Sequence, residues 1–148
     1  MGTEQPRLRA VLDTNVIIAA LRSTNPTSPT AELLRRWQAG EFELLYSADL
    51  RAEYERKFPR RGVDTDRAEN FLRQLVVSGI FVEPLTIENV VQTDINDNMV
   101  VACAITGKAT HLVTYDVHLR GLGEIYEGIT IVDGLHFLYL VRGDTPPG

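Results

Sequence analysis

The chain has 148 residues, a formal net charge of −5 and one cysteine, Cys103. This length predicts one domain with one sizeable core, and a single cysteine excludes an internal disulfide. The acidic balance gives no reason to expect nucleic-acid binding over the whole surface, so such binding would need a local patch or bound cations. The first residues lack the apolar core of a signal peptide, and no apolar run reaches the ~18 residues of a membrane span. We therefore expect a cytoplasmic protein that does not contact a membrane.

The hydrophobic pattern predicts short strands that alternate with helices. Strands are expected at 8–12, 42–47, 80–85, 111–115 and 129–133, and helices at 16–23, 28–40, 48–58, 66–79, 97–108 and 134–141. The polar segment 23–30 predicts a loop, and 142–148 predicts a flexible tail. One domain over 1–148, with its core at about 8–141, is the expected organisation. Alternation of this kind is typical of an α/β fold with a parallel sheet.

Two aspartates directly follow predicted strands. Asp13 ends the first strand, and Asp116 follows the fourth, two residues after Thr114 on the same side of that strand. If the strand order is 3-2-1-4-5, these strands are neighbours where the order reverses, which is where such sheets bind ligands. Asp13 equally fits an N-cap of the next helix, and Asp116 equally fits a turn residue. Both interpretations stay open at this point.

A second acidic pair opens the predicted helix 97–108. Asp94 fits the N-cap, and Asp97 fits the first turn, where the helix dipole favours negative charge. Asp97 also lies three and four residues before Val100 and Val101, which directs it toward the apolar face. A carboxylate on that face needs a cation or hydrogen-bond donors. A ligand role for Asp97 therefore competes with a capping role.

Helical geometry does not select a further acid from helix 48–58, because Asp49, Glu53 and Glu55 all flank its apolar stripe. Carboxylates gathered at one sheet edge repel each other, and they are stable when they hold hard divalent cations. The sequence contains no Cys/His spacing that indicates zinc. It contains no G-x-G-x-x-G motif and no P-loop, so dinucleotide and ATP binding lack support.

Four motifs in order, "VLDTNVII", "YSADLRAEYERKF", "DINDNMVVACAI" and "ATHLVTYDVHL", resemble the PIN-domain family. The resemblance covers about 8–141. It is strongest to the stand-alone, VapC-like branch, whose members are toxins of toxin–antitoxin systems. It implies a three-layer α/β/α sandwich with a five-stranded parallel sheet of order 3-2-1-4-5. It also implies an endoribonuclease that depends on Mg²⁺ or Mn²⁺.

The resemblance assigns roles to individual residues. The catalytic and metal-binding acids fall on Asp13, Glu53, Asp97 and Asp116, and the supporting residues on Asn15, Asp94 and Thr114. Many relatives carry one more acid shortly after the fourth, where this chain has Val117 and His118. That departure bears on a second metal ion and leaves the four main acids intact.

The segment 56–61 is the best candidate for contacts to RNA phosphates, through Arg56, Lys57, Arg60 and Arg61. It fits a solvated helix end equally well. The resemblance also implies an RNA substrate, a cognate antitoxin and a homodimer, for which the apolar segments 30–40 and 71–79 offer surfaces. Two alternatives remain: a catalytically inactive PIN-like scaffold that binds protein, and a Mg²⁺-binding receiver-like signalling domain. A receiver expects an aspartate after its third strand, where this chain has Glu83 and Pro84.

Overall fold

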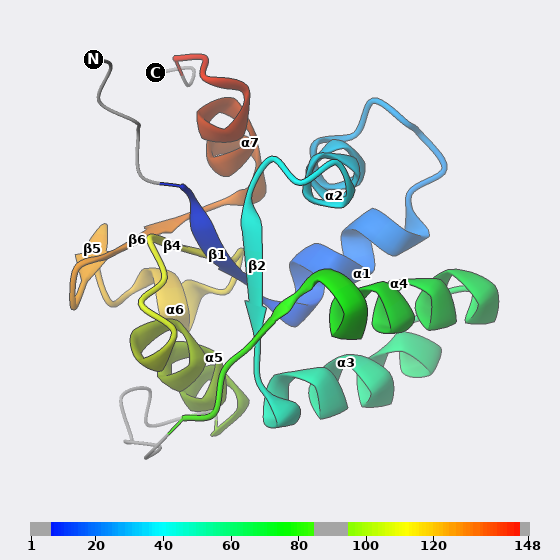
Figure 1. Cartoon of the computed structure of the whole chain (residues 1–148), viewed down its shortest axis with the longest axis horizontal. Helices are drawn as coiled ribbons and strands as arrows, with labels where there is room; N and C mark the ends of the chain where they lie inside the picture. The colour runs from blue at the N-terminus through cyan, green and yellow to red at the C-terminus, as the bar shows by residue number, and fades with distance from the viewer. Residues whose placement is uncertain (1–6, 85–94, 146–148) are drawn as a thin grey trace.

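The computed structural model describes residues 7–84 and 95–145 (Figure 1). Within them the elements follow in the order β1 (Arg9–Leu12), α1 (Thr14–Arg22), α2 (Pro29–Gln38), β2 (Glu43–Tyr46), α3 (Ala48–Arg60), α4 (Thr65–Ser78), β3 (Ile80–Phe81), α5 (Ile95–Thr106), β4 (His111–Val113), α6 (Val117–Arg120), β5 (Ile125–Tyr126), β6 (Ile129–Val132) and α7 (Gly134–Arg142). The side chains of residues 95 and 96 are outside the description, as is the predicted site residue Asp94.

The strands form one sheet in the order β3-β2-β1-β4-β6-β5. The first five are parallel, and β5 runs antiparallel to β6. The predicted order of five parallel strands is confirmed, with β6 as the fifth. Two details of the prediction are wrong. A two-residue strand, β5, extends one edge, and β3 covers only Ile80–Phe81 of the predicted 80–85. Pro84 has no N–H for a strand ladder, which limits extension of β3.

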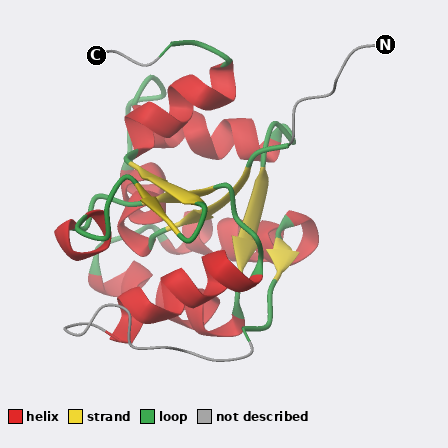
Figure 2. Ribbon diagram, turned by 90° about the vertical axis from the view of Figure 1, so that its left-hand side faces the viewer, coloured by secondary structure: helices red, strands yellow, loops and turns green. Residues whose placement is uncertain are grey.

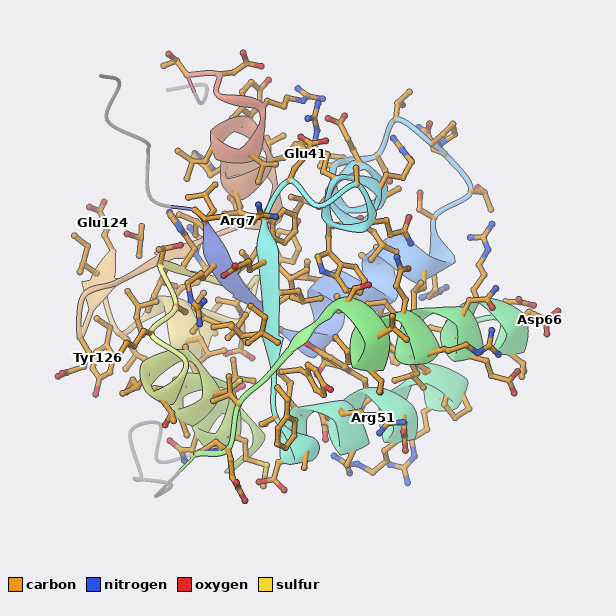
Figure 3. The ribbon with its side chains drawn as sticks, in the orientation of Figure 1. Arg7, Glu41, Arg51, Asp66, Glu124 and Tyr126 are labelled. Atoms are coloured by element: carbon orange, nitrogen blue, oxygen red, sulfur yellow. The ribbon has the colours of Figure 1, made fainter. Side chains whose placement is uncertain are left out.

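Helices cover both faces of the sheet, which confirms the three-layer architecture. Figures 1 and 2 show α2 and α7 on one side of the strands and α5 on the other. Helix α5 contacts β1, β2 and β4, while α7 contacts β4 and packs on α2. The central strand β1 is buried from Ala10 to Leu12. Figure 3 shows Asp66, at the start of α4, and Glu124, near β5, on the periphery of the molecule.

Local sequence fixes where the helices begin. The side chains of Ser28, Ser47 and Asp64 accept hydrogen bonds from the first turns of α2, α3 and α4. Such caps satisfy backbone N–H groups that have no partner inside a helix. Among the described residues, no helix has both the length and the apolar character required to cross a lipid bilayer.

Candidate active site

Four acidic residues line one small pocket at the carboxyl ends of β1 and β4. The pocket has a volume of about 80 Å³ and is lined by Asp13, Thr14, Asn15, Glu53, Lys57, Asp97, Val100 and Asp116. Asp13, Glu53 and Asp97 are only 7%, 9% and 5% exposed. The structure therefore brings together the four acids predicted as catalytic. The predicted supporting residue Asn15 lines the same pocket.

Asp13 caps a helix and lines the pocket at the same time. Its backbone N–H donates to the Val113 carbonyl at 2.9 Å, which continues the pairing of β1 with β4. Its Oδ1 accepts from the Thr14 N–H at 2.8 Å, and its Oδ2 accepts from the Thr114 hydroxyl at 2.8 Å. The two interpretations left open by the sequence are thus compatible, and the carboxylate is held in a defined orientation.

Thr114 connects the two strand ends that carry acids. It is completely buried, and its Oγ1 donates to Asp13 and accepts from the Asp116 N–H at 3.0 Å. Asp116 in turn caps α6, because its Oδ1 accepts from the N–H groups of His118 at 2.7 Å and Leu119 at 3.3 Å. Thr114 thus links the Asp13 carboxylate to the backbone of Asp116, and its supporting role in the site stays a prediction.

Basic residues of α3 and its C-terminus lie beside the acids. Glu53 forms an ion pair with Arg56, and its Oε1 lies 3.9 Å from Nζ of Lys57, which itself lines the pocket. Arg61 donates to Oδ1 of Asn15 at 3.0 Å. Arg60 is exposed and does not belong to the pocket lining. Of the four basic residues predicted to contact RNA, three therefore contact residues of the pocket.

Tyr54 positions Glu53, a role that the sequence pattern did not indicate. Its hydroxyl donates to the carbonyl of Leu12 at 2.5 Å, and the side chain is fully buried. Burial first, and the nearby Cys103 and Asp13 second, raise the pKa of Tyr54 well above its usual value, so its proton stays in place for this bond. The bond fixes α3 to the end of β1, one residue before Asp13. Periodicity assigns Tyr54 only to an apolar stripe and carries no signal for its hydroxyl.

The lining fits a divalent cation in donor type, because carboxylate oxygens are the ligands that Mg²⁺ and Mn²⁺ prefer. The acids do not already form a ligand set. Across the described residues, no group of three or more His, Cys, Asp or Glu side chains is arranged to hold a metal ion. Glu53 is paired with Arg56, and Asp116 accepts from the start of α6. To share one cation with Asp13, these two side chains would have to turn toward it.

Comparison with known proteins bears on this pocket. A family model described as "PIN domain" matches residues 9–118, a range that contains all four acids. A chain of the crystal structure of FitAcB from Neisseria gonorrhoeae has a similar fold, with a TM-score of 0.52 at 16% sequence identity. The match covers 86% of this chain and 99% of that one. A search of curated protein sequences gives no match.

Proposed function

We propose, from the premise that the chain belongs to the PIN domain family, that it is a metal-dependent endoribonuclease. PIN domains are generally nucleases, so membership supports hydrolysis of phosphodiester bonds at the level of the family. The observation that carries the proposal is the convergence of Asp13, Glu53, Asp97 and Asp116 on one pocket. Mutually repelling carboxylates at a sheet edge are costly for stability, so a functional role is their most direct explanation.

In this proposal the four acids hold Mg²⁺ or Mn²⁺. The cation would polarise a phosphate oxygen and favour deprotonation of an attacking water. The chain's own groups prepare the site. The Thr14 N–H and the Thr114 hydroxyl orient the carboxylate of Asp13. A rigid carboxylate loses little freedom when a ligand binds, which favours binding.

The α3 region supplies positive charge for the substrate. Lys57 lies in the pocket lining, and Arg61 lies next to Asn15. With Arg56 and Arg60 they form the proposed contact to RNA phosphates, which a net acidic protein needs locally. Single strands are the preferred substrate, because an unpaired loop can bend into a small pocket more readily than a stiff duplex.

The likeness to the stand-alone, VapC-like branch extends the proposal to a toxin of a toxin–antitoxin pair that acts in the cytoplasm, with a cognate antitoxin as partner. A homodimer is part of this proposal. Val76 and Val77 are exposed on α4 within the predicted segment 71–79, and they offer apolar surface for it. Light scattering at tens of micromolar protein tests the dimer, and a monomer there would remove it.

Cleavage of single-stranded RNA by the purified protein, with Mg²⁺ or Mn²⁺ and with chelator, tests the main proposal. We expect cleavage only with a cation. Asp13→Asn should lower the rate at least ~100-fold. Asn keeps an oxygen for the Thr14 N–H and loses the charge, so the fold should persist. Asp49→Asn is the matched control, since Asp49 is an exposed acid of the same helix as Glu53. A folded Asp13→Asn protein that cleaves at the unaltered rate would contradict the proposal and favour a protein-binding scaffold.

A further inference from the structure

The ring of Tyr115 is exposed and packs against the start of α7. The residue is 44% exposed, and its phenol oxygen lies against the backbone of Gly134. A Cβ on residue 134 would collide with that oxygen, so the close approach requires glycine. Gly134 is also the first residue of α7, where glycine contributes little to helix stability. Gly134 therefore permits a close contact between the start of α7 and the ring of Tyr115.

Three further side chains, those of Asp133, His136 and Arg120, gather around the same point. Oδ1 of Asp133 accepts from the backbone N–H of His136 at 2.8 Å and lies 2.7 Å from its Nδ1. Nη1 of Arg120 lies 3.7 Å from Oδ2 of Asp133. Nδ1 of His136 faces the carboxylate, so Nε2 is the ring nitrogen left for another ligand. The side chains of His136 and Arg120 both remain about half exposed.

Burial by itself would raise the pKa of Asp133. The hydrogen bonds from the backbone and ring of His136, followed by the charges of His136 and Arg120, outweigh that effect and lower the pKa below its usual value. Asp133 is therefore a carboxylate near neutral pH and holds both basic side chains in position. We call Tyr115, Arg120, Asp133 and His136 the Asp133 cluster.

Sheet register places the Asp133 cluster next to the acid pocket. Leu12, Val113 and Val132 are partners across β1, β4 and β6. The residues that follow them, Asp13, Thr114 and Asp133, therefore lie in a row along one sheet edge. Neighbouring strands are ~4.8 Å apart, so the backbone of Asp133 lies about 10 Å from that of Asp13. In the sheet, β2 and β4 lie on opposite sides of β1, and helix α3 directly follows β2 in the chain. The pocket therefore lies between the basic residues of α3 and the Asp133 cluster.

We propose that Tyr115, Arg120 and His136 form a nucleotide subsite, in which a base of single-stranded RNA stacks on Tyr115 and its phosphate contacts Arg120 and His136. This inference rests on the proposed ribonuclease function. An exposed aromatic ring beside basic side chains is the combination that binds single strands without base-specific hydrogen bonds. Helix capping explains the contact between Asp133 and His136, but it does not explain an exposed Tyr115 that packs against the start of α7 beside Asp116. One strand can then extend from α3 past the acids to the Asp133 cluster.

Fluorescence anisotropy with a labelled, random-sequence RNA of about 12 nucleotides tests the subsite. The Asp13→Asn background keeps the RNA intact during the measurement. Tyr115→Leu should raise Kd about tenfold, which equals ~1.4 kcal/mol, because leucine retains bulk and loses the stacking face. Tyr115→Phe retains that face and should stay within about twofold. Phe81→Leu is the matched control, because Phe81 is a 55% exposed aromatic residue at the end of β3.

The outcomes separate the two proposals. If Tyr115→Leu weakens RNA binding no more than Phe81→Leu does, the subsite proposal is wrong. The ribonuclease proposal then still stands. If the Asp13→Asn protein binds none of the RNA pool and the unaltered protein cleaves none of it, both proposals fail. Unfolding curves of every variant show whether a change in Kd reflects lost structure. Weak binding by Tyr115→Phe as well as by Tyr115→Leu would also count against stacking.

Discussion

The acid pocket and the contact between α2 and α7 use carboxylates in opposite ways. In the α2–α7 clamp, defined by Glu32, Arg36, Glu41 and Arg142, Glu32 accepts from Nε of Arg142 at 2.7 Å and from Nε of Arg36 at 2.8 Å. These hydrogen bonds, that of Arg142 first, lower the pKa of Glu32 from 4.5 to about 2. Arg36 also bonds Glu41 at 2.6 Å. In the pocket, four acids share a lining in which Lys57 is the single basic side chain.

Charged side chains stabilise the fold in the clamp, whereas those in the pocket lower its stability. In the clamp, the two arginines offset the two glutamates, which ties α7 to α2. In the pocket, like charges are crowded in a shielded position, and that arrangement costs stability. Functional sites often carry such a cost, and substitutions that relieve it commonly stabilise a protein while reducing its activity. Changes in the two regions should therefore have opposite consequences.

The largest effect is expected for Asp97→Asn. Removing one charge from the pocket should lower RNA cleavage at least ~100-fold and leave the thermal midpoint equal or higher, because repulsion is relieved. Cleavage rates and thermal unfolding measure these two quantities, and calorimetry measures the affinity of the protein for Mn²⁺. If Asp97 serves only the first turn of α5, its replacement would leave both Mn²⁺ affinity and cleavage unchanged.

A smaller, opposite effect is expected for Glu32→Gln in the clamp. Because the folded pKa of Glu32 is depressed from 4.5 to about 2, its contribution to stability is present above pH 4.5 and is lost as the pH falls toward 2. At neutral pH the substitution should lower the free energy of unfolding by about 1–2 kcal/mol, after allowance for solvent screening, with cleavage unchanged. Urea unfolding at several pH values checks this. If the unaltered protein and Glu32→Gln still differ in their free energy of unfolding as the pH falls toward 2, the stabilising role of the Glu32 carboxylate is wrong.

The smallest effect is expected for Arg56→Ala, and this residue connects the two kinds of charge arrangement. Arg56 gives the pocket acid Glu53 an ion pair of the kind seen in the clamp. Freed from it, Glu53 should bind Mn²⁺ about threefold more tightly, since an exposed arginine competes only weakly. Arg51→Ala is the control. Nε of Arg51 lies 3.3 Å from Oε1 of Glu55, and neither residue lines the acid pocket. Unchanged Mn²⁺ affinity in calorimetry would argue against Glu53 as a ligand.

The strand pattern placed Asp13 and Asp116 at the ends of strands, and the strand order implied by the family resemblance predicted that these strands are neighbours. Parallel strands that are neighbours end at the same sheet edge, so the two residues were expected to lie near each other. Glu53 was selected only through the family resemblance. In the structure it is buried, whereas Asp49 and Glu55 are exposed. What turns Glu53 inward is the docking of α3 through Tyr54 on Leu12, a contact between residues 42 positions apart. No local periodicity encodes such a contact.

Two short elements escaped prediction because they are too brief for a periodic signal. Helix α6 has four residues and begins where Asp116 caps it. Strand β5 has two residues and forms a hairpin with β6 through Glu127 and Gly128. Both have positive φ, at 51° and 80°, as the tight turn of a two-residue hairpin requires. Glu–Gly is a weaker hairpin signal than Asn–Gly or Asp–Gly, because glutamate rarely adopts that conformation.

The hydrogen bond from Thr114 to Asp13 joins residues 101 positions apart, and this separation has a consequence for biosynthesis. A growing polypeptide presents Asp13 and β1 early, but β1 must wait for β4 to complete its pairing at the centre of the sheet. Asp97 and Asp116 emerge from the ribosome last among the four acids of the pocket. A nascent chain stalled before residue 116 therefore holds only part of the acid set, and the proposed hydrolytic activity would arise late in translation.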